Sequence, residues 1–257
     1  MSYNKISLDF EGPVAVLKFR DPEAMNAISL EMLDELTDAV GKLARNKNAR
    51  CLLLTGEGRG FCAGANLNET SSGGAGDILR SGYHPLLFAL RDLEMPIVTA
   101  VNGAAAGVGM SFALLGDLVC ASKNAFFLQA FARIGLVPDG GATYMLPRLI
   151  GRARATELSM LAERLPAEQA EEWGLINRLY DHPAQLMEGA LELATRLANG
   201  PRSLSLIRKA YWSTWGNSYE AQLELEAKLQ TEAGRTKDAR EGIAAFLEKR
   251  DAKFQGE

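Results

Sequence analysis

The order of apolar and polar positions predicts β-strands that alternate with helices over the first part of the chain. Residues 5–10 and 13–19 alternate between the two kinds of side chain, which predicts a β-hairpin. From Ser29, a residue type that caps helix N-termini, apolar residues recur every three or four positions to about Arg45. This spacing predicts an amphipathic helix that buries one face.

Later segments repeat this alternation, and the last part of the chain changes to helices alone. Strands are predicted at 51–54, 97–101, 117–121, 125–129 and 173–180. Helices are predicted at about 78–92, from about 142, and over most of the chain after residue 150. This order is typical of an α/β core followed by a helical appendage.

Two short segments rich in glycine and alanine lie between these elements. Residues 60–67 (GFCAGANL) follow the apolar run at 51–54, and residues 102–110 (NGAAAGVGM) follow the run at 97–101. Either segment alone is more typical of a tight turn between a strand and a helix than of a binding site. Small residues also let a ligand approach the backbone, so that free N–H groups can point at it. Two such groups converging on one oxygen would make an oxyanion hole.

Composition and charge narrow the class of protein. The chain has 257 residues, 47% of them hydrophobic and 23% charged, which favours an ordinary globular protein. Its net charge of −4, without a long basic block, gives no reason to expect a nucleic-acid partner. No apolar run could span a membrane and no secretory signal is recognisable, so we expect a cytoplasmic protein without a membrane contact. The three cysteines and two histidines lack metal-ligand spacing, and we expect no metal site.

Several ordered motifs together resemble the crotonase superfamily, the enoyl-CoA hydratase/isomerase family. They cover nearly the whole chain: residues 25–27 (MNA), 60–67, 102–109, 135–141 (GLVPDGG), 167–176 (AEQAEEWGLI) and 246–250 (FLEKR). The resemblance implies a spiral of ββα units, here residues 1–200, followed by a helical trimerisation region, here residues 201–257. It also implies an acyl-CoA thioester as substrate, an enolate intermediate, and a homotrimer or dimer of trimers. Coenzyme A would be part of the substrate, and no other cofactor is expected.

The resemblance places the binding residues on the two glycine- and alanine-rich segments. The oxyanion donors fall on the backbone N–H groups of Ala65 and Val108. The Val108 N–H would lie in the first turn of a helix, where the helix dipole also favours an anion. Most family members have glycine at this position, so the valine adds bulk beside the thioester. The positions that hold coenzyme A correspond to Ala24, Met25, Ala63 and Gly64.

The reaction that follows enolate formation depends on three other side chains. Hydratases of this family position and split water with two glutamates, and the matching positions here hold Ser111 and Phe131. Neither side chain can act as a general base, so hydration by two glutamates is poorly supported. Phe131, with Leu136, is instead expected to form an apolar wall that would raise the pKa of a neighbouring acid.

Asp139 is the acid that remains in a matching position. Some isomerases of the family carry their catalytic carboxylate there, and the surrounding residues are most similar to the branch that acts on 1,2-epoxyphenylacetyl-CoA and shifts double bonds in acyl-CoA. One carboxylate can take a proton from one carbon and return it to another while the oxyanion hole holds the dienolate. Locally, Pro138-Asp139-Gly140 is also an ordinary turn signature.

Other readings of the same residues remain open. A hydratase could instead use Asp139 alone as its catalytic acid. A dehalogenase branch of the family has a histidine at the position of His84 and a nucleophilic aspartate at that of Asp139, although a helix histidine without a role is the more ordinary interpretation of His84. A non-catalytic acyl-CoA binder is the alternative outside enzymes. The segment Thr70–Gly76, the helix at 78–92 and the aromatic residues are expected to shape the acyl end of the pocket.

Overall fold

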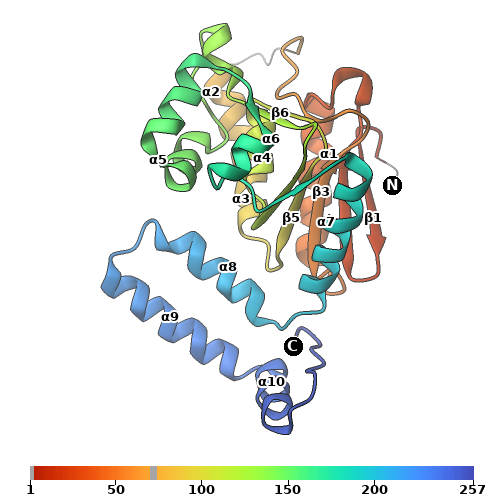
Figure 1. Cartoon of the computed structure of the whole chain (residues 1–257), viewed down its shortest axis with the longest axis vertical. Helices are drawn as coiled ribbons and strands as arrows, with labels where there is room; N and C mark the ends of the chain where they lie inside the picture. Colours follow the sequence, from red (N-terminus) through yellow and green to blue (C-terminus); the bar gives the residue numbers. More distant parts are fainter. Residues whose placement is uncertain (1–2, 70–73) are drawn as a thin grey trace.

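The computed structural model describes residues 3–69 and 74–257, so most of the Thr70–Gly76 segment lies outside the described residues. Figure 1 shows an α/β part with three C-terminal helices below it. A six-stranded sheet has the order β1-β2-β3-β5-β7-β10. Only β1 runs antiparallel to its neighbour. The strands are β1 (Ile6–Glu11), β2 (Val14–Phe19), β3 (Cys51–Gly56), β5 (Ile97–Val101), β7 (Leu118–Ser122) and β10 (Arg178–Tyr180).

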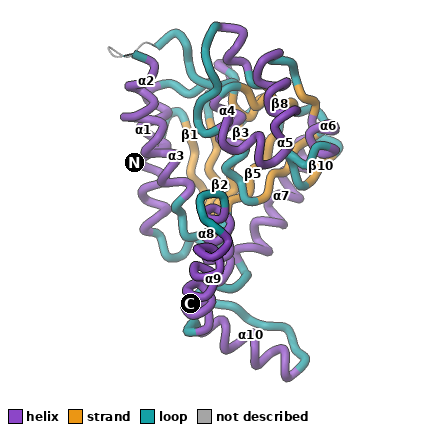
Figure 2. Tube along the Cα trace, turned by 90° about the vertical axis from the view of Figure 1, so that its left-hand side faces the viewer, coloured by secondary structure: helices purple, strands orange, loops and turns teal. Residues whose placement is uncertain are grey.

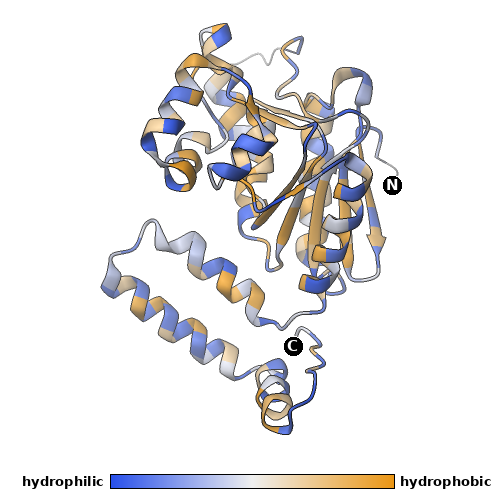
Figure 3. Cartoon of the chain, viewed as in Figure 1, coloured by the Kyte–Doolittle hydropathy of each residue, from blue (hydrophilic) through white to orange (hydrophobic). Residues whose placement is uncertain are grey.

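Helices cover both faces of this sheet. Helices α1 (Leu30–Arg45) and α3 (His84–Arg91) lie on one face and α7 (Pro183–Ala198) on the other (Figure 2). Side chains of β3 alternate between the two layers: Leu52 and Leu54 join the larger apolar cluster, whereas Leu53 packs in the cluster with α7. Because both faces are covered, the central strands are mostly apolar, as Figure 3 shows.

A second, smaller sheet has the order β4-β6-β8-β9. Its strands are β4 (Gly60–Cys62), β6 (Ala104–Ala106), β8 (Phe126–Leu128) and β9 (Leu165–Pro166). The strands β4, β6 and β8 each come directly after a strand of the large sheet, namely β3, β5 and β7, and before a helix. Each unit therefore contributes one strand to each sheet and then a helix, which confirms the predicted spiral of ββα units.

Three sequence predictions need correction. The glycine- and alanine-rich segments are not simple turns, because each contains a three-residue strand, β4 or β6. The strand predicted at 173–180 is wrong in its first half: helix α6 (Ala167–Glu172) ends at Trp173, and only Arg178–Tyr180 is extended. The helix predicted at 78–92 consists of α2 (Ala75–Ile78), a π-helical turn (Leu79–Tyr83) and α3.

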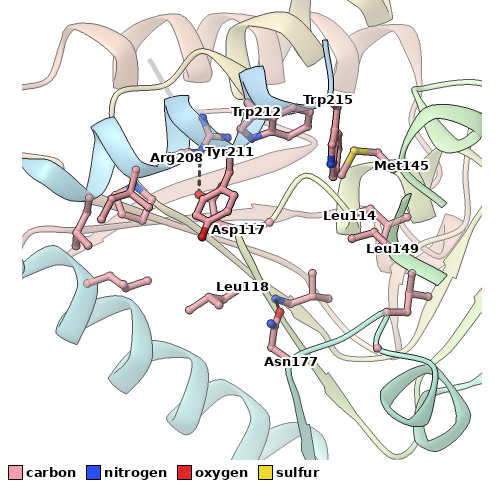
Figure 4. A pocket seen from close by; sticks show the side chains of 18 residues that line it. Leu114, Asp117, Leu118, Met145, Leu149, Asn177, Arg208, Tyr211, Trp212 and Trp215 are labelled. Carbon is pink, nitrogen blue, oxygen red and sulfur yellow. Dashed lines mark hydrogen bonds and ion pairs between the residues drawn. The ribbon is translucent and has the colours of Figure 1, made fainter. Parts of the chain in front are cut away.

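The C-terminal helices α8 (Ser203–Thr214), α9 (Tyr219–Gly234) and α10 (Lys237–Glu248) add no strand to either sheet. The buried Arg208 of α8 joins them to the core through a 2.7 Å ion pair with Asp117 and through hydrogen bonds to the carbonyl groups of Leu90 and Leu93. Figure 4 shows this pair at the edge of an apolar pocket of about 430 Å³ between α8 and the core. No residue of the segments 60–67 and 102–110 lines this pocket.

The C-terminal tail is held by one buried carboxylate. Asp238, which is 2% exposed, accepts hydrogen bonds from the backbone N–H groups of Arg202, Gln255 and Gly256. This carboxylate therefore ties the start of α8 to the end of the chain. In the described residues, no helix is long and apolar enough to cross a membrane.

Candidate active site

The residues on either side of Ala65 form backbone hydrogen bonds with Ile28, whereas the N–H of Ala65 does not. Ile28 donates to the carbonyl oxygen of Gly64 (2.7 Å) and accepts from the N–H of Asn66 (2.9 Å), which makes a parallel bridge between Ile28 and Ala65. Since the two flanking residues point toward Ile28, the N–H of Ala65 points the other way. Among the described residues, it has no backbone or side-chain acceptor.

The second free N–H belongs to the start of a helix. Helix α4 (Val108–Ala113) begins after Gly107, whose φ of 53° and ψ of −131° suit glycine. The N–H of Gly107 is used by the carbonyl group of Leu128 (2.9 Å). The next N–H, that of Val108, lies in the first helical turn and therefore lacks an intrahelical acceptor. Nothing in the described part of the chain accepts it.

Glycines bring these two backbone segments side by side. A Cβ atom on Gly64 would lie 3.0 Å from the carbonyl oxygen of Ala106 and 3.8 Å from the Cα atom of Gly107. A Cβ atom on Gly109 would overlap the backbone carbonyl group of Cys62. Glycine at positions 64 and 109 therefore lets the end of β4 lie directly against the start of α4, with both free N–H groups in one region.

Two buried asparagines hold β4 in this place. The side chains of Asn26 and Asn102 both donate to the carbonyl oxygen of Gly60, at 2.8 and 3.2 Å. Asn26 itself has a positive φ of 58°, an uncommon conformation for a residue other than glycine. Sequence reasoning missed this role, because these asparagines lie 34 and 42 positions from Gly60.

Asp139 lies against the same helix. The hydroxyl group of Ser111 on α4 donates to the backbone carbonyl oxygen of Asp139 at 3.0 Å. The next residue, Gly140, has a φ of +60°, and a Cβ atom there would lie 2.9 Å from the Cγ2 atom of Val108. The structure thus brings together Ala65, Val108 and Asp139, which are far apart in the sequence.

The carboxyl group of Asp139 has an unusual environment. Its Oδ1 atom is buried and has no hydrogen-bond partner in the described structure. Burial raises the pKa of Asp139 from 3.8 to about 6, and neither a neighbouring charge nor a hydrogen bond opposes this rise. A carboxylate with such a pKa is a stronger base than an exposed one and is still ionised at neutral pH.

Tyr83 is a buried tyrosine whose environment the sequence did not reveal. It is 4% exposed, and burial first, then the charges of Cys62, Asp139 and Glu69, raise the pKa of its phenol. Its position depends on the π-helical turn Leu79–Tyr83, a feature common at functional sites. Nothing in the local sequence signals this turn, so Tyr83 was expected only as one of several aromatic residues.

Of the other predicted site residues, most lie near the two donor segments, and His84 does not. The backbone of Met25, which follows the short helix Pro22–Ala24, accepts from the N–H of Ala63 at 3.0 Å, so the residues expected to hold coenzyme A are neighbours. The ring of Phe131 lies 3.8 Å from where a Cβ atom of Gly107 would be. His84 is different, since its ring faces Phe88 with 6.2 Å between centroids and contributes nothing to the pKa of Asp139.

Chemically, this arrangement offers two unused N–H donors and one carboxylate with a raised pKa. Of the two residues predicted to form an apolar wall, Phe131 is buried, whereas Leu136 is 47% exposed. The donors could bind an anionic oxygen, and the carboxylate could move a proton. In the described residues, no group of three or more His, Cys, Asp or Glu side chains is placed to hold a metal ion.

Comparison with known proteins places this chain in a family. The sequence model of the family "Enoyl-CoA hydratase/isomerase" matches residues 9–257. The chain is 44% identical to 1,2-epoxyphenylacetyl-CoA isomerase of Escherichia coli K12, with 96% of each chain covered. It is 42% identical to a protein of Rhodobacter capsulatus named "probable enoyl-CoA hydratase", with both chains covered in full.

Solved structures agree with these sequence relatives. The fold superimposes on the crystal structure of enoyl-CoA hydratase from Bacillus anthracis with a TM-score of 0.92 and 30% identity, over 99% of this chain and 100% of the other. The names of the relatives include both isomerases and hydratases. What all of them share with this chain is the ββα spiral and the sequence pattern along its whole length, and the protein is a member of the enoyl-CoA hydratase/isomerase family.

Proposed function

We propose that this protein is an acyl-CoA isomerase that uses Asp139 as its single acid/base. The observation that carries the proposal is the partly buried carboxyl group of Asp139, whose buried Oδ1 atom has no partner and whose pKa is raised by burial to about 6, near the free N–H groups of Ala65 and Val108. The similarity to the Escherichia coli isomerase supports the same reaction class.

In the proposed mechanism, the thioester oxygen accepts hydrogen bonds from Ala65 and Val108. The Asp139 carboxylate removes a proton from the α-carbon, and the electron pair moves into the thioester to form a dienolate. The two N–H groups stabilise the negative charge on the oxygen. The protonated Asp139 then returns the proton to the γ-carbon, and the double bond moves from the β,γ to the α,β position. The proton and charge balance without a cofactor.

The same residues would allow a related reaction on a strained ring. In 1,2-epoxyphenylacetyl-CoA, the substrate in the name of the Escherichia coli relative, one CH2 group joins the thioester carbonyl group to the epoxide-bearing ring, so an α-proton is again open to the base. We include ring isomerisation of such an epoxide in the proposal. The identity of the acyl group depends on the pocket walls, to which the buried Phe131, beside Gly107, and the buried Tyr83 would contribute.

Hydration is the second candidate, because several relatives are named hydratases. Against it, Ser111 and Phe131 stand at the two glutamate positions, and the Ser111 hydroxyl group is engaged by the Asp139 backbone. A dehalogenase mechanism would need His84 near the reacting atoms, whereas its ring faces the half-exposed Phe88. A non-catalytic acyl-CoA binder would not need a basic carboxylate at all.

We also propose that residues 1–200 form the acyl-CoA-binding unit and residues 201–257 a helical unit that assembles the chain into a trimer or dimer of trimers. Apolar side chains on α10 support this, since Ile243, Phe246 and Leu247 are 64%, 83% and 74% exposed. Light scattering of the protein in solution tests the assembly. A cytoplasmic location and the lack of any cofactor besides coenzyme A stay predictions.

Two measurements on one variant test the reaction. With a 3-enoyl-CoA substrate, isomerisation creates a conjugated thioester and raises ultraviolet absorbance, whereas hydration of a 2-enoyl-CoA lowers it. We expect Asp139→Asn to bind acyl-CoA normally and to lose turnover by ~10² or more. The variant should also lose exchange of substrate α-protons with deuterated water.

The matched control is Asp181→Asn, which removes an exposed carboxylate that pairs with Lys123 on the surface. It should leave both turnover and exchange unchanged. Wild-type turnover in Asp139→Asn would contradict the proposal. If the wild-type protein consumes 2-enoyl-CoA much faster than it isomerises 3-enoyl-CoA, the hydratase alternative replaces it.

A further inference from the structure

In the described structure, no hydrogen bond to the side chain of Asp139 fixes the position of its carboxyl group. The Oδ1 atom is buried without a hydrogen-bond partner, and no hydrogen bond shifts the pKa of the carboxyl group. A base must lie within hydrogen-bond reach of the carbon-bound proton it removes, so its position matters as much as its basicity. The position of this carboxyl group must therefore come from its backbone.

The backbone of Asp139 is fixed from two sides. Its carbonyl oxygen accepts from the N–H of Ala142, at 3.1 Å, which forms the turn into α5 (Ala142–Leu161). The same oxygen accepts from the hydroxyl group of Ser111 at 3.0 Å. The first bond lies within the loop and the helix it enters, whereas the second reaches across to α4. Only the Ser111 bond therefore relates Asp139 to the helix that carries the Val108 donor.

Close packing strengthens this connection. A Cβ atom on Gly140 would lie 2.8 and 2.9 Å from the Cβ and Oγ atoms of Ser111, so the peptide after Asp139 rests directly on this side chain. Ser111 is 3% exposed. A serine inside a helix usually bonds the carbonyl group four residues earlier in its own helix. Here that local bond is replaced by one to Asp139, 28 positions away.

We propose that Ser111 is a positioning residue that sets the location of Asp139 relative to the oxyanion donor of Val108. The proposal rests on the function proposed above for Asp139. It also explains the chemistry of position 111: the side chain that would be a catalytic glutamate in a two-glutamate hydratase here anchors the backbone of a different acid. A longer side chain at this position would displace the Asp139–Gly140 peptide, so the two arrangements exclude each other.

The test removes the hydroxyl group and leaves the rest of the side chain. We expect Ser111→Ala to lower kcat for 3-enoyl-CoA isomerisation about tenfold, because small displacements of a catalytic group are costly, with KM changed less than about twofold. The control is Ser205→Ala, which loses a hydroxyl bond to a backbone carbonyl group on α8 and should keep wild-type kcat. A wild-type kcat in Ser111→Ala overturns the inference.

Two further readouts separate positioning from a general structural role. In an Asp139→Asn background, adding Ser111→Ala should reduce the residual rate less than about twofold, because residues that act through one another are not additive. A loss of full size in that background overturns the inference. In the single variant, a loosened loop admits water to the carboxyl group, so the acidic limb of the pH–rate profile should move to lower pH.

Failure of this inference and failure of the proposed function look different. If Asp139→Asn keeps wild-type turnover, Asp139 is not the acid/base, whatever Ser111→Ala does. If Asp139→Asn is inactive while Ser111→Ala has wild-type kcat and an unmoved pH profile, the function stands and the positioning role is wrong.

Discussion

The two sheets of this protein are built on opposite principles. The large sheet is stabilised by its side chains, since residues such as Leu53 and Leu54 are completely or almost completely buried between helices. The small sheet has strands of two or three residues; β6 is three alanines, and β4 has one large side chain, the fully buried Phe61. Gly64 and Gly109, next to these strands, permit close backbone approach. The longer strands of the large sheet bury rows of apolar side chains, whereas the small sheet sets the backbone geometry around Ala65 and Val108.

The contrast between the two sheets is tested most strongly by replacing a large buried side chain of the large sheet with a small one. Leu53→Ala removes a fully buried side chain in the cluster with α7 and should lower the free energy of unfolding by about 3–4 kcal/mol. The kcat of the folded protein should not change, because Leu53 lies far from Asp139 in the fold and in the opposite layer from α4. Urea unfolding at a fixed protein concentration, with kcat measured in parallel, checks both. A tenfold fall in kcat would erase the distinction between the sheets.

The opposite change, adding one methyl group beside the small sheet, should affect both properties. In Gly109→Ala the new Cβ atom would overlap the carbonyl group of Cys62, so α4 and β4 must move apart. We expect a loss of about 2–3 kcal/mol from overpacking. We also expect kcat to fall at least about tenfold, because the Ala65 and Val108 donors separate.

Gly234→Ala is the matched control for that variant. Gly234 ends α9, and a Cβ atom there would meet nothing within 4 Å. Alanine should raise the free energy of unfolding by about 0.5 kcal/mol, since it loses less backbone entropy than glycine. Equal effects of the two substitutions would show that close packing at Gly109 has no special importance.

A smaller effect concerns the pH dependence of kcat/KM. Asp139 must be ionised to act as a base, and burial raises its pKa to about 6. The value of kcat/KM should therefore be constant above about pH 7 and fall by about tenfold per pH unit below pH 6. Initial rates between pH 4.5 and 8.5, in buffers of constant ionic strength, measure this. A profile that stays flat down to pH 5 would place the essential acid elsewhere.

Replacing the Asp139 carboxyl group should also produce a small gain in stability. Because the folded-state pKa of Asp139 is raised above the unfolded value of about 3.8, the folded protein binds more protons between these two pH values. Ionisation above pH 6 therefore costs stability. Asp139→Asn should raise the free energy of unfolding by about 1 kcal/mol at pH 7.5, because the carboxyl group is only partly buried, and not at pH 3.5. A loss of stability at pH 7.5 would mean that the ionised carboxylate is favourably held.

The difference between the sheets also explains what could be predicted from the sequence. Strands such as Cys51–Gly56 and helix Leu30–Arg45 follow from apolar runs and from apolar spacing with a serine cap. The family resemblance located Asp139, Ala65 and Val108, and the structure brings these residues together. A strand of three residues is too short to show a periodicity, so β4 and β6 were read as parts of turns.

Contacts between residues that are far apart in the sequence could not be predicted for a similar reason. The bond from Ser111 to the backbone of Asp139 depends on how α4 and the loop before α5 pack. A serine in an apolar helix carries no local signal of such a partner. The sequence therefore singled out Asp139 and Ser111 but not the contact between them.

The use of backbone donors has a consequence for how this scaffold can be redesigned. Apart from proline, no side-chain replacement deletes the N–H of Ala65 or Val108, so the two donors persist through substitutions that leave the chain path intact. In the proposed mechanism, Ser111, Phe131 and Asp139 then decide the reaction that follows. A small combinatorial library at these three positions would test whether proton transfer can be changed while the backbone donors stay the same.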